Sequence, residues 1–170
     1  ADVHKGNFAN CHPLNIAAAA GNLEIVKILI KAGSDANNRT NMSETPLHVA
    51  SENGYSEIVE FLLDNGAYPN WKNTRNEIPL SLAATAGHSK IVKNLINYGS
   101  ELNTINKNYH TALFTACLEG HLDIVKFLCL GGASLNITDR EFNSPLHIAP
   151  RDGNLEIVRV LIKAGASVLS

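Results

Sequence analysis

The stretch Thr45-Pro46-Leu47-His48-Val49-Ala50 recurs along the chain, in related forms, at a constant spacing of 33 residues. The four related stretches begin at His12, Ile78, Thr111 and Ser144. Self-similarity at one fixed period is typical of a repeat protein, in which each copy of a short unit packs only on its neighbours. Five copies fill the 170 residues. The sequence therefore predicts a single domain over residues 1–170, divided at about 7–39, 40–72, 73–105, 106–138 and 139–170.

Each copy has the pattern of two short helices. In the second copy Pro46 opens the first helix, where its missing N–H is harmless, and Leu47 and Ala50 share one helical face. Gly54 ends this helix, and the apolar stripe of a second helix then runs to Leu62. Helices of about eight to ten residues are not stable alone in water. Each pair must therefore bury its apolar face against the pairs before and after it.

Three motifs give the chain a resemblance to ankyrin-repeat proteins. They are Thr45-Pro46-Leu47-His48-Val49-Ala50, Gly54-Tyr55-Ser56-Glu57-Ile58-Val59-Glu60-Phe61-Leu62-Leu63 and Asn65-Gly66-Ala67, and their copies cover roughly residues 7 to 170. The resemblance implies an all-α repeat solenoid, in which stacked helix-turn-helix pairs are joined by β-hairpin-like loops. It does not name a function, because proteins of one fold carry out many unrelated ones.

Charge and composition argue against several classes of protein. The 14 basic and 16 acidic residues are spread along the chain, the formal net charge is −2, and no basic block favours nucleic-acid binding. Apolar runs such as Ile28-Leu29-Ile30 are far shorter than the ~20 residues of a membrane helix, so we expect no membrane insertion. The first residues show no apolar segment of a secretory signal. Three cysteines without a pairing motif favour a reducing, intracellular location in the cytoplasm or nucleus.

The sequence contains no residue arrangement typical of catalysis. The seven histidines and three cysteines lack zinc-ligand spacing, and no phosphate-binding loop, nucleophile elbow or carboxylate pair is found. We therefore expect no enzyme activity, no metal and no cofactor. The family resemblance implies instead that the rings of His48 and His147 bridge backbone groups of the loops. His88 and His121 follow turn glycines, and we expect them to be partly exposed linker residues.

Three residues depart from the repeat pattern. Tyr109 and Phe142 stand at loop tips, where a left-handed backbone is easy for Asn but costly for an aromatic residue. Either these two hairpins are reshaped or their aromatic side chains are offered to a partner. Pro150 falls inside the first helix of the fifth copy, where an interior proline costs roughly 3 kcal/mol. We expect that helix to be short, bent or frayed.

A loop asparagine recurs in four copies, at Asn37, Asn70, Asn103 and Asn136. In the family that the chain resembles, such asparagines can be hydroxylated by an intracellular oxygenase, and Asn103 is the best match to that context. The simpler interpretation, which we favour, is that these side chains bond the backbone of the turn.

The resemblance also implies where a partner binds, because loop tips and first helices of such arrays form a concave groove whose variable positions contact the partner. The predicted partner-binding residues are Phe8, Asn41, Met42, Glu44, Glu52, Trp71, Arg75, Glu77, Lys107, His110, Leu118, Arg140 and Arg151. Their mixed charges and scattered apolar anchors favour a peptide or a folded protein as the partner. The leading hypothesis is a non-catalytic protein–protein interaction module. Trp71 either belongs to this surface or packs on its own hairpin.

The alternative hypothesis is an architectural spacer, one segment of a longer ankyrin array within a larger protein such as a scaffold, a channel or a bacterial effector. Terminal copies of a solenoid usually carry a polar outer face. The last helix, predicted from Glu156 to Lys163, is instead as apolar as the interior ones. We expect a monomer, with an uncapped last copy that offers a surface for end-to-end stacking.

Overall fold

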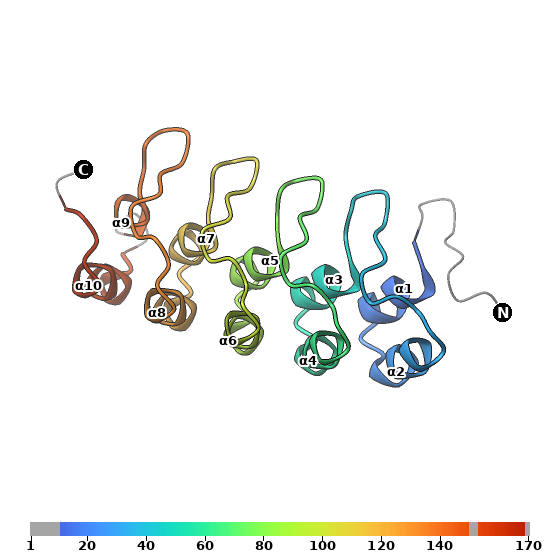
Figure 1. Ribbon diagram of the computed structural model, residues 1–170. Coiled ribbons are helices and arrows are strands. Elements are labelled where there is room, and N and C mark those ends of the chain that lie inside the picture. The colour runs from blue at the N-terminus through green and yellow to red at the C-terminus, as the bar shows by residue number, and fades with distance from the viewer. Residues whose placement is uncertain (1–10, 150–152, 169–170) are drawn as a thin grey trace.

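The computed structural model describes residues 11–149 and 153–168 and shows helix pairs stacked in a row (Figure 1). The first helices of the pairs are α1 (Pro13–Ala19), α3 (Pro46–Glu52), α5 (Pro79–Thr85), α7 (Ala112–Leu118) and α9 (Pro145–Ile148). The second helices are α2 (Leu23–Lys31), α4 (Ser56–Asp64), α6 (Ser89–Asn97), α8 (Leu122–Leu130) and α10 (Leu155–Lys163). Over these residue ranges no β-strand is present, and the expected all-α solenoid of stacked helix pairs is confirmed.

The helices form two parallel rows, one of first helices and one of second helices (Figure 1). The first helices contact one another from α1 to α9, and the second helices contact one another from α2 to α10. A long loop connects each pair to the next, and these loops all project from the same edge of the stack (Figure 1). The contacts run between neighbouring pairs, as expected for units that bury their apolar faces only by stacking.

The second pair shows why the sequence folds in this way. Pro46 occupies the first turn of α3, and Leu47 and Leu62 of the two helices have no exposed surface. Burial of one such leucine stabilises the fold by about 1.5–3 kcal/mol. Equivalent residues continue this stripe from Leu14 in α1 to Leu161 in α10, so one apolar core runs through the whole stack.

The turn glycines end the first helices, and because they lack a Cβ, a side chain of the next pair can pack closely against them. Gly54 has a φ of +84°, and a Cβ added there would lie 2.7 Å from Cε1 of His88. Nε2 of His88 donates to the carbonyl of Glu52 at 3.0 Å, and His121 bonds the carbonyl of Thr85 in the same way at 3.2 Å. The sequence predicts only partly exposed linker residues here. The structure shows that both half-buried histidines tie a helix pair to the preceding one.

Helix α9 ends at Ile148 after four residues, whereas α3 and α5 have seven each. The expectation of a short first helix in the fifth copy is therefore confirmed. Ala149 keeps helical backbone angles, with φ −53° and ψ −37°, but the proline that follows it in the sequence has no N–H to continue the helical hydrogen bonds. Pro150 itself lies outside the described residues.

The four hairpin tips share one backbone shape. Their φ values are +58° at Ser43, +60° at Asn76, +66° at Tyr109 and +63° at Phe142. The N–H of each of these residues donates to the carbonyl three residues earlier, at 2.8 to 3.2 Å. Tyr109 and Phe142 therefore do not reshape their hairpins, and that interpretation is wrong. They adopt instead a left-handed backbone that costs about 1–3 kcal/mol for a residue of this kind.

Candidate functional site

The edge of the molecule from which the loops project carries many of the predicted binding residues. We call it the hairpin face, and it comprises residues 40–44, 73–77, 106–110 and 139–143. Neighbouring hairpins on this face are bonded to each other. The Thr74 N–H donates to the Met42 carbonyl at 2.9 Å, and the Lys107 N–H donates to the Arg75 carbonyl at 3.0 Å. Nη2 of Arg140 then donates to the Lys107 carbonyl at 2.7 Å, so the row of tips is held in one arrangement.

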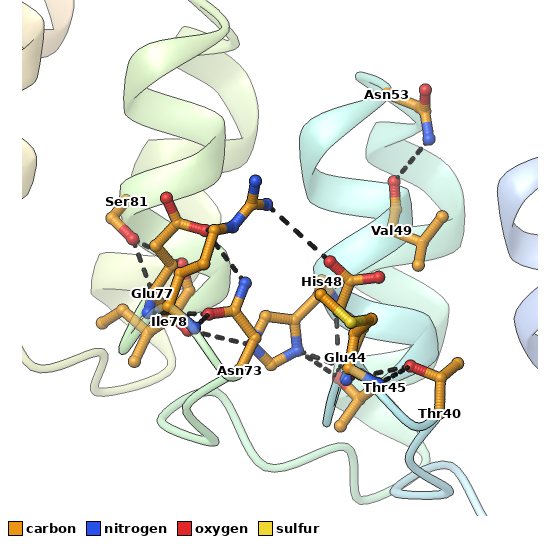
Figure 2. A network of polar contacts seen from close by, with 12 residues as sticks. Thr40, Glu44, Thr45, His48, Val49, Asn53, Asn73, Glu77, Ile78 and Ser81 are labelled. Atoms are coloured by element: carbon orange, nitrogen blue, oxygen red, sulfur yellow. Dashed lines mark hydrogen bonds and ion pairs between the residues drawn. The ribbon is translucent and has the colours of Figure 1, made fainter. Parts of the chain in front are cut away.

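One side chain at the start of each hairpin fixes its shape. Oδ1 of Asn73 accepts from the N–H groups of Arg75 and Glu77 at 2.8 and 3.0 Å, and its Nδ2 donates to Oε2 of Glu77 at 2.9 Å (Figure 2). Asn106 and Asp139 make the same two backbone bonds in the following hairpins. The tips are therefore built by local turn chemistry as well as by their neighbours.

His48 connects two hairpins from within α3 (Figure 2). Its Nδ1 accepts from the Thr45 N–H at 3.1 Å, and its Nε2 donates to the carbonyl of Glu77 at 3.2 Å. Burial lowers the pKa of this imidazole to about 4, since the charged form would lose its hydration. The ring is therefore neutral at pH 7, and the bridging role that the family resemblance implies is confirmed for His48. For His147 the structure shows the bonds of Nδ1 with Ser144 alone, so the bridge is not confirmed there.

Two carboxylates pair with one guanidinium at the centre of the hairpin face. Nε of Arg75 lies 2.8 Å from Oε2 of Glu77, and its Nη2 lies 3.9 Å from Oε1 of Glu44. The pKa of Glu44 is raised, first by burial and then by the carboxylate of Glu52, while Arg75 opposes this shift. Arg75 is half exposed, so this part of the face presents one cation among several acidic groups.

The structure places the predicted binding residues in three groups. The exposed ones are Asn41, Met42, Glu52, Trp71, Arg75, Lys107, Leu118 and Arg140. The half-buried ones are Glu44, Glu77 and His110. The ring of His110 stacks on buried Phe114 with 4.3 Å between centroids, so it serves packing as well as the surface. Phe8 and Arg151 lie outside the described residues.

Trp71 fits both of the interpretations that the sequence leaves open. Its side chain is 37% exposed, with the guanidinium of Arg39 4.6 Å above the ring centroid. The ring of Tyr68 meets it edge-on, with 5.7 Å between centroids. These contacts hold the indole in place while leaving one part of it at the surface.

The comparison with known proteins agrees with this geometry. A family model described as ankyrin repeats (3 copies) matches residues 1–73 and 80–170. The chain belongs to the ankyrin-repeat family. It is also similar to a crystal structure of an ankyrin repeat domain from Acinetobacter baumannii AYE, with 31% sequence identity and a TM-score of 0.93. That similarity covers 98% of this chain and 88% of the other. A search among curated proteins gives no match. Ankyrin repeats are in general protein–protein interaction modules.

Two aromatic side chains of this ankyrin-repeat chain add to the predicted surface. Phe142 is 82% exposed at its hairpin tip, and Tyr109 is 48% exposed. The guanidinium of Arg140 lies 5.2 Å from the centroid of the Tyr109 ring. Neither aromatic residue is among the predicted binding residues. Their position at a left-handed tip is the signal by which the sequence offers both side chains to a partner, as one of two interpretations.

The loop asparagines connect successive ankyrin repeats. Oδ1 of each accepts from a backbone N–H in the loop of the next helix pair, at 2.8 to 3.2 Å. The pairs are Asn37 with Tyr68, Asn70 with Glu101, Asn103 with Ser134, and Asn136 with Ser167. These bonds confirm the favoured interpretation, in which the asparagine side chains bond the backbone of a turn. The turn that each asparagine bonds belongs to the next helix pair.

Within 11–149 and 153–168, no group of three or more His, Cys, Asp or Glu side chains could hold a metal ion. In the part of the chain that the structure describes, no helix has the length and apolar content needed to cross a membrane. Burial raises the pKa of Cys117 to about 12, so this thiol is protonated and a poor nucleophile at pH 7.

Proposed function

We propose that this ankyrin-repeat domain is a non-catalytic protein–protein interaction module that binds a protein or peptide partner on its hairpin face. The observation that carries the proposal is the continuous bonding from Met42 through Thr74, Arg75 and Lys107 to Arg140. A surface fixed before binding loses little conformational entropy when a partner arrives. The function therefore depends on the backbone of the tips as much as on their side chains.

The residue types on the face support a protein or peptide as the partner. Met42 and Phe142 supply exposed apolar area, and Trp, Tyr, Met and Arg are the residues most enriched at the centres of interfaces. Exposed Glu52 and exposed Arg75 add charges of both signs close together. A mixed surface of this kind suits a partner with its own alternating charges better than a nucleic acid, which presents a uniform row of phosphates.

A displayed peptide library provides a ligand for the first test. Peptides selected on the immobilised domain are measured by calorimetry against wild-type protein and the double variant M42A/R75A. Loss of an interface anchor usually costs more than about 1.4 kcal/mol, so we expect affinity to fall at least tenfold. The matched control is R159A, because Arg159 is an exposed arginine on α10 with one ion pair to Glu156. Equal affinity of wild-type protein and M42A/R75A would refute the proposal.

The alternative of an architectural segment is favoured by the last helix pair. The ring of His147 bonds the Ser144 N–H through Nδ1, as His48 bonds Thr45, yet His147 is exposed and His48 is buried. Ile162 is likewise exposed where Cys129 of the preceding pair is partly covered. Stacking of a second copy or a further repeat would cover both side chains. Sedimentation velocity tests the first case: concentration-dependent association that H147D removes would support it, and a monomer at every concentration would contradict it.

We also propose an intracellular location for this domain. Buried Cys117 and half-buried Cys129 are free thiols, and free thiols are typical of a reducing compartment. Microscopy of the tagged parent protein in its own cells tests this, and an extracellular signal would contradict it.

A further inference from the structure

A recessed apolar surface lies on the outer row of helices, away from the hairpin face. Two adjoining hollows make it up, one of about 240 Å³ between α6 and α8 and one of about 490 Å³ between α8 and α10. Leu130 lines both hollows and separates them. We call this surface the outer trough, and its principal residues are Lys93, Ile96, Lys126, Phe127, Leu130, Val160 and Lys163.

Leu130 departs from the pattern of the outer helices. It is the last residue of α8, and it is 85% exposed. The other outer helices end on polar residues, namely Lys31, Asp64, Asn97 and Lys163. A leucine at this position adds no burial to the fold, so the stability of the stack does not explain it.

Positive charge gathers around the trough, although the chain as a whole is slightly acidic. Helices α6, α8 and α10 carry five basic and two acidic side chains, whereas α4 carries three acidic ones and no basic one. The two acids, Asp123 and Glu156, pair with Lys126 and Arg159 of their own helices. Lys93 and Lys163 line the hollows, and over the described residues neither makes an ion pair. The trough therefore offers uncompensated cations beside an apolar floor.

We propose that the outer trough is a second docking surface, which binds an acidic amphipathic segment of a partner protein. Bulky apolar side chains of that segment fill the hollows on either side of Leu130, and its carboxylates meet Lys93, Lys126 and Lys163. The larger hollow has the size of sites that enclose small ligands, ~300–1,000 Å³, so it has room for at least one large side chain. An amphipathic helix laid in an apolar groove is a common form of such recognition.

The shape of the trough favours a protein segment over a membrane surface. Ile96, Phe127 and Val160 are half-buried, and among these trough residues only Leu130 projects as an apolar side chain. Membrane binding needs a broad, protruding apolar face that enters the headgroup region. Recessed apolar residues are reached instead by side chains that project from a partner. The proposal is independent of the hairpin face, because the two surfaces share no residue.

The test uses a displayed library of peptides of about 16 residues, selected on the M42A/R75A protein so that hairpin-face binders are excluded. We expect the enriched peptides to combine Asp or Glu with Leu, Ile, Phe or Trp. Labelled copies are then titrated by fluorescence polarisation. L130N and K163E should each weaken binding at least about tenfold. The matched controls are K31E, at the same place in α2, and I28N, which removes an exposed apolar residue of that helix. Both controls should leave the affinity unchanged.

Several outcomes would overturn the proposal. Selection of neutral or basic peptides, or of peptides insensitive to L130N and K163E, would show that the trough is not the site. Binding of phosphatidylserine vesicles that L130N abolishes, without any peptide binder, would assign the surface to a membrane. Self-association that L130N or K163E abolishes would assign it to a second copy. Circular dichroism of each variant excludes unfolding as the cause, and intact hairpin-face binding by L130N separates this result from the first proposal.

Discussion

His48 holds two hairpins together through both nitrogens of a neutral ring, so its protonation state matters for the fold. The same position in the first repeat is Asn15, which is also buried and donates from Nδ2 to the carbonyl of Glu44 at 3.3 Å. Asparagine therefore makes the same connection to the next hairpin without a titratable group. The chain itself thus supplies a conservative replacement for His48.

Replacement of His48 by Asn should reduce the sensitivity of the fold to acid. The folded-state pKa is about 4 and the ordinary value is 6.5, so the unfolded chain takes up a proton first as pH falls. The stability from the neutral ring is complete above pH 6.5 and is lost progressively down to pH 4. Between pH 7 and pH 5, protonation of this group in the unfolded chain lowers the free energy of unfolding by about 2 kcal/mol. Urea unfolding at both pH values measures the free energy of unfolding. From pH 7 to pH 5 it should fall by about 2 kcal/mol less in H48N than in the wild type, and equal falls would contradict a buried, neutral His48.

Phe142 combines a strained backbone with an almost fully exposed side chain. Replacement by Asn, which accepts a left-handed backbone more easily, should stabilise the fold by about 1 kcal/mol. The same change should weaken the binding of any partner that contacts the Phe142 ring. Thermal unfolding measures the first effect, with E141N at the neighbouring exposed position as the control. An F142N protein no more stable than wild type would show that the tip carries no strain.

At the scale of the element, the turn glycine of each first helix is also a contact between repeats. Gly54 and Gly66 have the same φ of +84°, but only Gly54 faces a neighbour, the ring of His88. Nothing lies within 4 Å of a Cβ added at Gly66. The two glycines thus separate the cost of backbone strain from the cost of close packing.

Gly54→Ala should therefore destabilise the domain more than Gly66→Ala. Backbone strain costs both variants about 1–2 kcal/mol, and the clash with His88 adds about 1–3 kcal/mol in G54A alone. Urea unfolding of both variants measures the difference. The added variant H88A tests the cause, because removal of the ring should make G54A and G66A nearly equal. Equal destabilisation of G54A and G66A in the presence of His88 would contradict the close packing of Gly54 on that ring.

The helices were largely predictable from the sequence, because their signals are local and repeat five times. Leucine and alanine on one face and glycine at the turn give the same result in each copy, and proline at the first turn supports it in four of the five. Pro150 likewise predicts a short α9. The connections between repeats were less predictable, because they join residues about 30 positions apart. The bonds of His88 and His121 are examples of side-chain geometry that no periodicity reports.

The candidate site was predictable only in part, for the same physical reason. The loop tips were identifiable, and Met42, Arg75 and Arg140 are exposed there as expected. Exposure of one aromatic ring and packing of another depend on neighbours in space. The sequence therefore left Phe142 between a reshaped hairpin and a ring offered to a partner, and it assigned His110 to the surface although its ring stacks on Phe114. The outer trough depends on two gaps between helices and was not visible in the sequence.

At the scale of the whole molecule, two surfaces are built by the same stacking. Backbone bonds between loops fix the hairpin face, and gaps between α6, α8 and α10 form the outer trough. Each surface spans several repeats, so neither exists in one helix pair alone. The domain thus converts weak, local units into two extended surfaces of different charge and shape.

The central claim is that the hairpin tips are fixed before a partner binds, and amide hydrogen exchange of the free domain tests it most directly. The amides of Thr74 and Lys107 donate to the carbonyls of neighbouring hairpins, so they should exchange more slowly than in an unstructured peptide, by about a hundredfold or more. Exchange of both amides at the rate of an unstructured peptide would contradict the account, since the face would then form only on binding.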